Sequence, residues 1–392
     1  MRILHISNKP IFPLIDGGCK AINQTLSSLM RLSKVKHICL STYKHPFNKT
    51  EYPKDILNEA DVETIYVETK LNFFKAFLNL LFNISYNFSR FYSNRANAII
   101  QKKILEEKFD VIVLDNLYAC AYIDTIKKKS TAKIIYRSHN VEHVIWERLY
   151  KNEQFIFKRI YLNILSKQLK NIELKILKKV DAVWSISNTD SLYLLNKTPY
   201  LSTIPMALNF PDKKPEYSNK DLFFIGSYNW SPNIDAVTWL CNVLLPKLHE
   251  KDPNIVLHIA GSYSDEIKSN LTYSKNINFH GFVKDSNEFM VNNGIFVMPI
   301  RTGSGVRVKA LEAMALSVPI IASEMALEGL ECENSFLKAD GIDDWLEKIH
   351  LLRSSESMRI DLSNNAYSYV KSKYNIEQID KLIKKELEKI LA

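Results

Sequence analysis

The sequence has 392 residues, of which 46% are hydrophobic and 24% charged; this is ordinary for a globular protein, and the length favours two domains. No apolar run reaches the roughly 20 residues that a membrane-spanning helix needs, and the first residues read as a strand, not as a secretion signal. The five cysteines lack metal-ligand spacing and are typical of free thiols, so the composition predicts a cytoplasmic protein.

Charge is distributed unevenly along the chain. Residues 1–200 contain 31 Lys and Arg against 18 Asp and Glu, whereas the remainder contains 21 against 25. A basic first half indicates a face that meets an anionic membrane surface or nucleic acid, or it is simply solvated. No nucleic-acid-binding motif is present and the charge is spread over helices, so we expect no nucleic acid partner.

The first half alternates apolar strand-like runs with helical patterns, which predicts a parallel, doubly wound sheet. Ligands of such sheets bind at the carboxyl ends of the strands. After the first strand, Asp16-Gly17-Gly18 leads into a helix from about Lys20. The predicted strands cover residues 3–7, 35–41, 64–67, 111–114, 133–136 and 182–186.

Two segments of the first half combine apolar and basic residues. Residues 71–95 are rich in Phe, Leu and Tyr, and residues 151–180 have the pattern of one long basic amphipathic helix. Each pattern fits a helix packed on the sheet, and each also fits a helix on a membrane surface.

The fifth predicted strand is followed by His139, Glu142 and His143. Their spacing matches the inverted zinc-protease signature H-x-x-E-H, whose histidines share one helical face. His139 follows the strand directly, which favours a loop position and argues against a zinc site. For His143 we prefer an ordinary polar role at a helix start.

A linker around residues 198–220 precedes a second alternating half. It contains predicted strands at 222–225, 255–260, 277–279, 294–299 and 319–322, and the chain closes with an amphipathic helix from Ile376 to Leu391.

The most informative stretch is the glycine-rich turn 302–305 between a strand and a helix. Unpaired N–H groups and the helix dipole make such a helix start attractive to phosphate. Arg307 and Lys309 add positive charge, and Glu312 could accept hydrogen bonds from ribose hydroxyls. The alternative is a surface helix on which Lys309 and Glu312 merely pair.

Residues 303–315, GSGVRVKALEAMA, resemble the donor-binding segment of the GT-B glycosyltransferases of family 4, in the subgroup with G-S-G-x-x-x-K-x-L-E-A-M-A. The resemblance implies an α/β fold of two Rossmann-like doubly wound domains facing a cleft. The acceptor-binding domain would span 1–200 and the nucleotide-sugar donor-binding domain 201–374. The helix at 375–392 would return to the first domain.

The resemblance further implies retaining, metal-independent transfer of a hexosyl or related group from a nucleotide-sugar, without a cofactor. The acceptor would be a glycan or lipid-linked molecule, in bacterial surface polysaccharide or glycoconjugate synthesis. The enzyme would be cytoplasmic or peripheral on the inner face of the membrane. The alternative is a catalytically silent GT-B protein that binds a sugar nucleotide or glycan.

Specific residues follow from the same resemblance. His139 and Lys309 match catalytic positions. Many relatives carry a glutamate where this chain has Ser304, and distant ones carry Arg and Lys within 227–233, where this chain has neither. The donor-binding residues implied are Gly17, Gly18, Ser227, Gly303, Ser304, Gly305, Val306, Arg307, Lys309 and Glu312.

Overall fold

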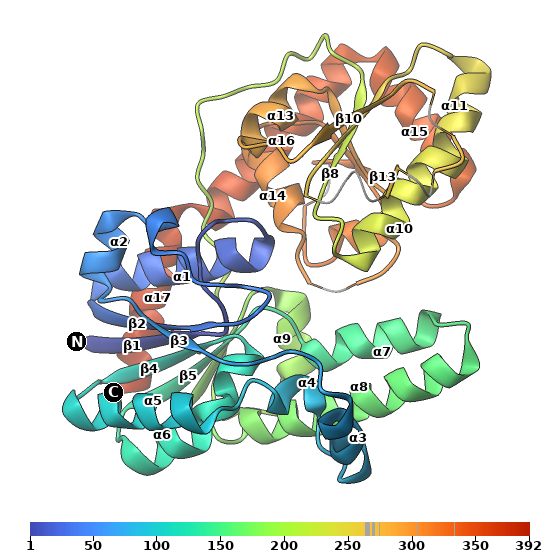
Figure 1. The fold of residues 1–392 in the computed structure, drawn as a ribbon. Coiled ribbons are helices and arrows are strands. Elements are labelled where there is room, and N and C mark those ends of the chain that lie inside the picture. The colour runs from blue at the N-terminus through green and yellow to red at the C-terminus, as the bar shows by residue number, and fades with distance from the viewer. Residues whose placement is uncertain (263–266, 269–270, 274, 304, 333) are drawn as a thin grey trace. The chain divides into compact units, whose positions relative to one another are not determined.

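The structure is a computed structural model that describes residues 1–262, 267–268, 271–273, 275–303, 305–332 and 334–392. The chain divides into two compact units. Unit 1 contains Met1–Ala207 and Ile376–Ala392, and unit 2 contains Leu208–Asn375 (Figure 1).

Unit 1 is built on a seven-stranded parallel sheet with the order β3-β2-β1-β4-β5-β6-β7. Its strands are β1 (Arg2–Ser7), β2 (Lys34–Ser41), β3 (Glu63–Tyr66), β4 (Val111–Asp115), β5 (Lys133–Ser138), β6 (Ala182–Ser185) and β7 (Leu201–Thr203). The central strands are buried on both faces, which explains why they read as continuous apolar runs.

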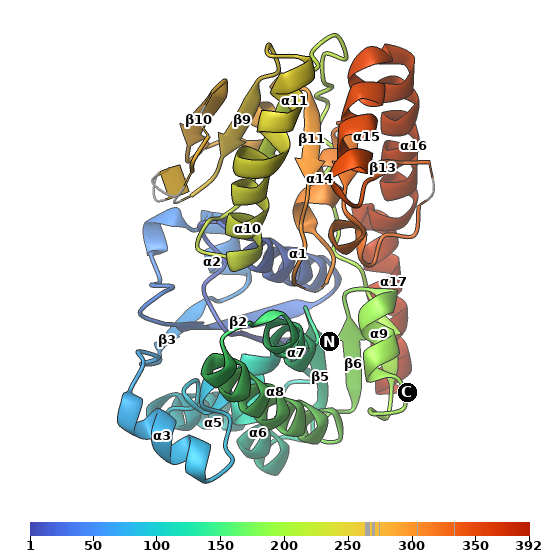
Figure 2. The same ribbon diagram turned by 90° about the vertical axis from the view of Figure 1, so that its right-hand side faces the viewer.

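Helices cover both faces of this sheet (Figure 2). They are α1 (Gly17–Leu32), α2 (Lys54–Glu59), α3 (Phe73–Leu81), α4 (Tyr86–Ser89), α5 (Asn94–Glu106), α6 (Ile123–Lys129), α7 (Glu142–Asn152), α8 (Ile156–Leu177), α9 (Asn188–Leu194) and α17 (Ile376–Leu391). Successive strand residues enter opposite cores: Ile3 belongs to the apolar cluster that contains α1, and Leu4 to the one that contains α5.

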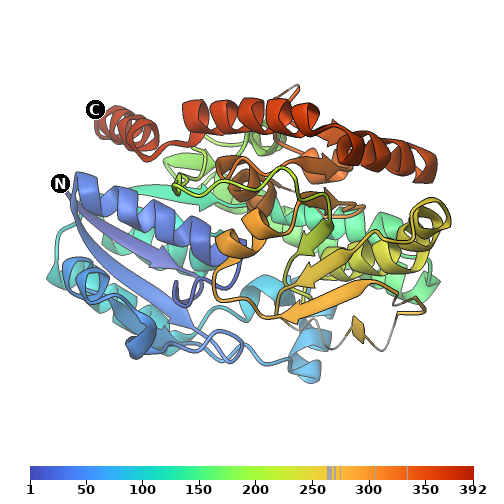
Figure 3. The ribbon, with the colours of Figure 1, turned by 90° about the horizontal axis from the view of Figure 1, so that it is seen from above.

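The last helix, α17, returns to unit 1 and packs beside α1, as predicted (Figure 3). Ile379 and Ile383 join the same apolar cluster as Ile22 of α1. Arg31 also forms an ion pair with Asp380, with Nη2 2.9 Å from Oδ1.

Unit 2 holds a six-stranded parallel sheet with the order β10-β9-β8-β11-β12-β13. Its strands are β8 (Leu222–Ile225), β9 (Leu257–Ala260), β10 (Ile277–Gly281), β11 (Ile295–Met298), β12 (Ile320–Ala322) and β13 (Leu337–Lys338). Its helices are α10 (Ser231–Trp239), α11 (Leu245–Lys251), α13 (Ser286–Asn292), α14 (Val308–Ala315), α15 (Ile342–Ser354) and α16 (Glu356–Tyr374).

The predicted α/β class with two Rossmann-like units is confirmed, and every predicted strand is present within a few residues of its expected bounds. The single helix expected over 151–180 is wrong. Residues 151 and 152 end α7, and a new helix, α8, begins at Ile156, because Glu153 and Phe155 adopt extended backbone between them. Among the described residues, no helix is long and apolar enough to cross a membrane.

Candidate functional site

Each sheet has one point where the strand order reverses direction. In unit 1 it lies between β1 and β4, and in unit 2 between β8 and β11. Loops that leave the two strands at such a point diverge to opposite faces, and the crevice outside their carboxyl ends is the usual ligand site of these sheets. The predicted site residues of each unit follow strands at or next to these points.

In unit 2 the loop after β11 carries the glycine-rich turn. Gly303 has a φ of +110°, a conformation that favours glycine, and a Cβ there would come within 2.9 Å of Nη2 of Arg307. The guanidinium of Arg307 therefore lies against this turn, with Nη2 3.4 Å from the carbonyl oxygen of Thr302. Gly305 also has a positive φ, of +80°. Ser304 lies outside the described residues.

The helix that follows begins at Val308, with Arg307 as its N-cap and Val306 half-buried just before it. No side chain caps the helix start within the described residues. Lys309 Nζ lies 3.0 Å from Oε2 of Glu312, and both side chains are partly exposed. The pairing that the sequence left as an alternative is thus present, and it sets a cation and a carboxylate side by side near the N-terminus of α14.

The loop after β8 leaves the other strand of this reversal point. Ser227 Oγ lies 2.8 Å from both Asn229 Oδ1 and Ser262 Oγ. Behind it the two loops approach so closely that a Cβ on Gly261 would meet the carbonyl oxygen of Gly226 at 1.7 Å. Ser227 is therefore held by hydroxyl and amide partners, next to a backbone contact that requires glycine at position 261.

Sequence reasoning did not identify Arg301, which lies between β11 and the glycine turn. Its guanidinium binds Asp235 of α10 through two bonds, of 2.9 Å and 2.5 Å. This bidentate pair joins the loop after β11 to α10, the helix that follows β8. A charged residue three positions after a buried strand was the available signal.

In unit 1, Gly17 and Gly18 form the start of α1, after β1. Asp16 caps this helix by accepting a hydrogen bond from the Cys19 N–H at 2.7 Å. Lys9 Nζ lies 2.7 Å from both Asp16 carboxylate oxygens, and a Cβ on Gly18 would come within 2.9 Å of that ammonium. The Asp16 carboxylate therefore already occupies the N-terminus of α1, and the Lys9 ammonium lies beside Gly18.

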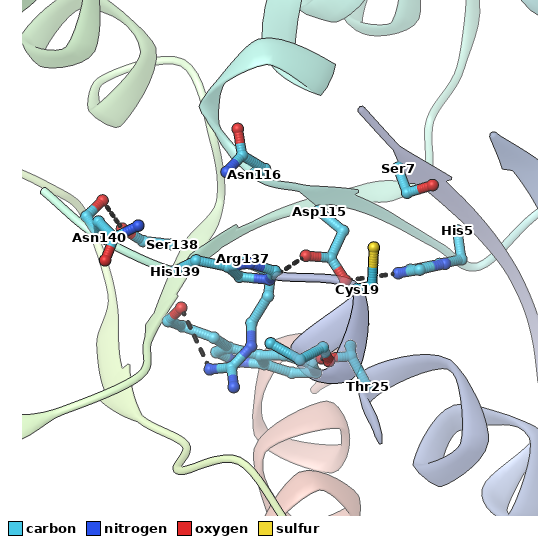
Figure 4. A network of polar contacts seen from close by, with 12 residues as sticks. His5, Ser7, Cys19, Thr25, Asp115, Asn116, Arg137, Ser138, His139 and Asn140 are labelled. Atoms are coloured by element: carbon cyan, nitrogen blue, oxygen red, sulfur yellow. Dashed lines mark hydrogen bonds and ion pairs between the residues drawn. The ribbon is translucent and has the colours of Figure 1, made fainter. Parts of the chain in front are cut away.

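A buried chain of polar side chains crosses the unit 1 sheet (Figure 4). His139 follows β5 directly and contacts Oδ1 of Asp115 through Nε2. Oδ2 of Asp115 lies 2.8 Å from Nε2 of His5, and Nδ1 of that ring lies 2.9 Å from Nδ1 of His37. Three of the four are fully buried, and His139 is 7% exposed.

The surroundings shift the pKa values of two members of this chain. Burial alone would raise the pKa of the Asp115 carboxyl, but the rings of His139 and His5 hold that pKa well below its usual range. Burial, followed by the neighbouring His5, lowers the pKa of His37. Asp115 is therefore a carboxylate and His37 a neutral ring.

The remainder of the H-x-x-E-H stretch has separate partners. His143 Nδ1 lies 2.5 Å from Oε2 of Glu173, a fully buried residue of α8. Glu142 accepts a hydrogen bond from the Tyr118 hydroxyl at 3.2 Å, and burial together with the Glu173 carboxylate raises its pKa to about 7. Since α7 begins at Glu142, His139 lies outside the helix and cannot share a helical face with His143.

His5, His37 and Asp115 were missed as site residues. They lie on three different strands and are far apart in sequence, so only the strand order β2-β1-β4-β5 brings them to His139. Polar residues inside otherwise apolar strands were the available signal.

The comparisons with known proteins agree with this architecture. Residues 219–354 match the family described as glycosyl transferases group 1. A 44.6 kDa protein in the cps region of Klebsiella pneumoniae is 24% identical over 398 residues, covering 98% of this chain and 99% of that protein.

Two solved structures share the whole fold. Sucrose-phosphate synthase from Thermosynechococcus elongatus has a TM-score of 0.73 at 13% identity, covering 100% of this chain and 99% of that one. HepE from Anabaena, in complex with UDP, has a TM-score of 0.69 at 11% identity, covering 99% and 100%. Residues 219–354 thus match the family of glycosyl transferases group 1, and the whole chain shares the GT-B fold with these two solved structures.

Proposed function

We propose that the protein is a glycosyltransferase that moves a sugar from a nucleotide-sugar to a glycan or lipid-linked acceptor with retention of configuration. The observation that carries the proposal is the group of residues at the β8/β11 reversal point. It combines the glycine turn, the N-terminus of α14 and the Lys309–Glu312 pair within the segment that matches the glycosyltransferase family. The fold shared with HepE, whose structure contains UDP, supports a nucleotide-sugar as the donor.

The chemistry follows from where negative charge develops. Departure of a nucleoside diphosphate leaves charge on its phosphate oxygens, and fixed cations and N–H groups can stabilise it. Lys309, Arg307 and the N-terminus of α14 would supply that stabilisation, so we propose that transfer needs neither a metal ion nor a cofactor. Glu312 would accept hydrogen bonds from the ribose hydroxyls, and Ser227 with Gly303 and Gly305 would leave room for the diphosphate.

The donor site is tested by replacing Glu312. We expect Glu312→Gln to weaken binding of the preferred nucleotide about tenfold or more, because a charge-assisted hydrogen bond contributes roughly 1.5–3 kcal/mol. Isothermal titration with a panel of nucleoside diphosphates and their sugars would measure this and identify the base. Glu347→Gln, an exposed carboxylate of α15 in the same unit, is the matched control. Unchanged affinity in a folded Glu312→Gln protein would remove Glu312 from the donor site.

A catalytically silent sugar-nucleotide-binding protein is the alternative. Both proteins would bind the donor, so turnover decides between them. Release of the nucleoside diphosphate, by transfer or slow hydrolysis, is expected only from the enzyme. The relative from a cps region of Klebsiella pneumoniae supports polysaccharide or glycoconjugate synthesis as the setting.

We also propose that unit 1 binds the surface of an anionic membrane, which would bring it to a lipid-linked acceptor. Helix α3 buries none of its residues and exposes Phe73 and Phe74 at 80% and 71%. The turn between α7 and α8 exposes Phe155 and Phe157 at 62% and 73%. In Figure 1, α3 lies below α8, and in Figure 2 it lies at the lower left, clear of the strands in both views.

The charges beside these apolar residues favour a membrane as the partner. Residues 71–95 contain three Lys and Arg and no acidic residue, and Lys158 and Arg159 directly follow Phe157. Aromatic side chains with adjacent cations are typical of elements that lie in the interface of an anionic bilayer, where each basic residue contributes about 1 kcal/mol.

Vesicle flotation tests this surface. The protein should float with vesicles of phosphatidylcholine and phosphatidylglycerol but not with phosphatidylcholine alone, and binding should fall as salt rises, because screening acts over about 8 Å at physiological ionic strength. Phe74→Ser with Phe157→Ser should abolish flotation. Leu105→Ser, which changes an exposed apolar residue of α5, should not. Equal flotation of the double variant and the Leu105→Ser control would refute the assignment.

A further inference from the structure

A small cavity inside unit 1 is lined by two buried N–H groups that meet no acceptor among the residues the structure describes. The cavity lies between α1, β5, β6, α17 and residues 204–207, and its volume is about 10 Å³, which is room for a single small occupant. We propose that it binds one small inorganic anion, such as chloride, between Arg137 and Trp184. The inference does not depend on the proposed function, because neither the sugar donor nor the acceptor takes part in it.

The two N–H groups belong to side chains that are almost completely enclosed. Trp184 of β6 is 0% exposed and Arg137 of β5 is 2% exposed. Neither Nε1 of Trp184 nor Nε of Arg137 has a hydrogen-bond partner within the described part of the chain. A buried N–H group without an acceptor is unfavourable, and more so on a charged side chain. Because both residues line the same cavity, a single occupant can accept from both N–H groups.

Arg137 also places a positive charge beside the cavity. Burial lowers the pKa of its guanidinium to about 10, although the Asp115 and Asp190 carboxylates oppose this shift electrostatically, so the group remains a cation at neutral pH. Its Nη1 donates to the carbonyl oxygens of Ser185 and Ile204 at 3.0 Å and 2.6 Å. In Figure 4 the guanidinium points away from the Asp115 carboxylate. A buried cation whose acceptors are neutral carbonyl groups is favoured by an anion beside it.

An anion fits this lining better than a water molecule does. A water would accept from the two N–H groups, but its own two O–H groups would need acceptors. The hydroxyls of Thr25 and Ser28 already form hydrogen bonds within α1, at 3.0 Å and 3.1 Å. The lining side chains from residues 204–207 and from α17 are apolar. An anion requires donors only, to which the amide of Gln24 can add its N–H groups, and it would neutralise the charge of Arg137.

The place of the cavity gives the anion a structural role. Residues 204–207 end the first stretch of unit 1, and α17 is its second stretch, with unit 2 between them in sequence. An anion bound to β5 and β6 would fill the space under both segments. It would therefore fasten to the unit 1 sheet the two places at which the chain passes from one unit to the other.

Bromide crystallography locates the anion, because bromide has the charge of chloride and nearly its size. Crystals of the full chain in sodium bromide should show an anomalous peak between Nε of Arg137 and Nε1 of Trp184. In crystals of Trp184→Phe the peak should be much weaker, since the N–H group is lost while an aromatic ring remains. A wild-type cavity without a bromide peak, filled by water alone, would overturn the proposal.

Thermal unfolding tests the same site in solution. We compare the Tm in sodium chloride with the Tm in sodium gluconate, whose anion is too large for the cavity, at equal ionic strength. With chloride at about ten times its dissociation constant, this difference should be about 3–6 °C larger in the wild type than in Trp184→Phe. Trp345→Phe, which changes a buried tryptophan of α15 in unit 2, should match the wild type. The same difference in the wild type and Trp184→Phe would contradict the proposal.

Hydrogen–deuterium exchange shows whether the anion fastens α17. Amides of α17 should exchange more slowly in chloride than in gluconate, whereas those of α15 in unit 2 should exchange alike in the two salts. In Trp184→Phe the effect on α17 should be lost. Equal exchange of α17 in both salts would overturn the structural role. None of these measurements needs a sugar nucleotide, so they succeed or fail independently of the transferase proposal.

Discussion

Replacing Lys309 by methionine should lower the rate of sugar transfer about 100-fold or more. Removing one preorganised donor to a developing negative charge typically costs a factor of 10²–10³ in kcat. Lys309 lies in the first turn of α14, where the helix N-terminus adds to its field. Initial rates measured with excess EDTA check this, since no divalent cation can then replace the lost charge.

Because Lys309 is paired with Glu312, a double-mutant cycle is needed to separate a catalytic role of Lys309 from its role as a partner of Glu312. If Lys309 acts only as the partner of Glu312, methionine should cost little activity once Glu312→Gln has removed that partner. If Lys309 stabilises the leaving diphosphate, the loss should persist in the Glu312→Gln background. Lys348→Met, which breaks an ordinary surface pair with Asp344, serves as the control. If Lys309→Met transfers sugar at the rate of the wild type, Lys309 has no catalytic role.

Replacing Glu173 by alanine should destabilise unit 1 by about 3 kcal/mol, because it leaves buried N–H groups without their acceptor, at a cost of roughly 1–3 kcal/mol for each. Glu173 accepts the N–H groups of Glu142 and His143 at 3.2 Å, as well as the His143 ring. One carboxylate thus caps the start of α7 and satisfies a buried imidazole.

Hydrogen–deuterium exchange localises this effect. Amides of α7 should exchange about 100-fold faster in Glu173→Ala, while those of unit 2 should be unaffected, because the two units have separate cores. Glu173→Gln retains an acceptor oxygen and should show a smaller change. Equal protection of α7 in the wild type and Glu173→Ala would mean that Glu173 does not hold this helix.

The strands of both units could be predicted because each is an apolar run bounded by turn residues. The break between α7 and α8 could not, because the helical spacing of apolar residues continues through Glu153 and Phe155. The short edge strands β7 and β13 were missed as well, since edge strands are less apolar and lack a distinctive run.

The donor side of the site was predictable because its residues lie within one short stretch, from Gly303 to Glu312. The chain from His37 to His139 was not, because it depends on pairing between strands more than 100 residues apart, such as His5 and Asp115. A sequence shows that a strand carries a polar residue; only the strand order shows which polar residues meet.

Unit 1 is assembled from two separated stretches of the chain, with unit 2 between them in sequence. During synthesis, residues 208–375 leave the ribosome before α17 does, so unit 2 can fold while unit 1 still lacks one helix of the layer that contains α1. Until α17 arrives, Ile22 and Leu26 of α1 lack the apolar neighbours Ile379 and Ile383. A fragment that stops at Ala207 keeps that surface uncovered permanently, whereas unit 2 is one continuous segment and is the better choice for expression in isolation.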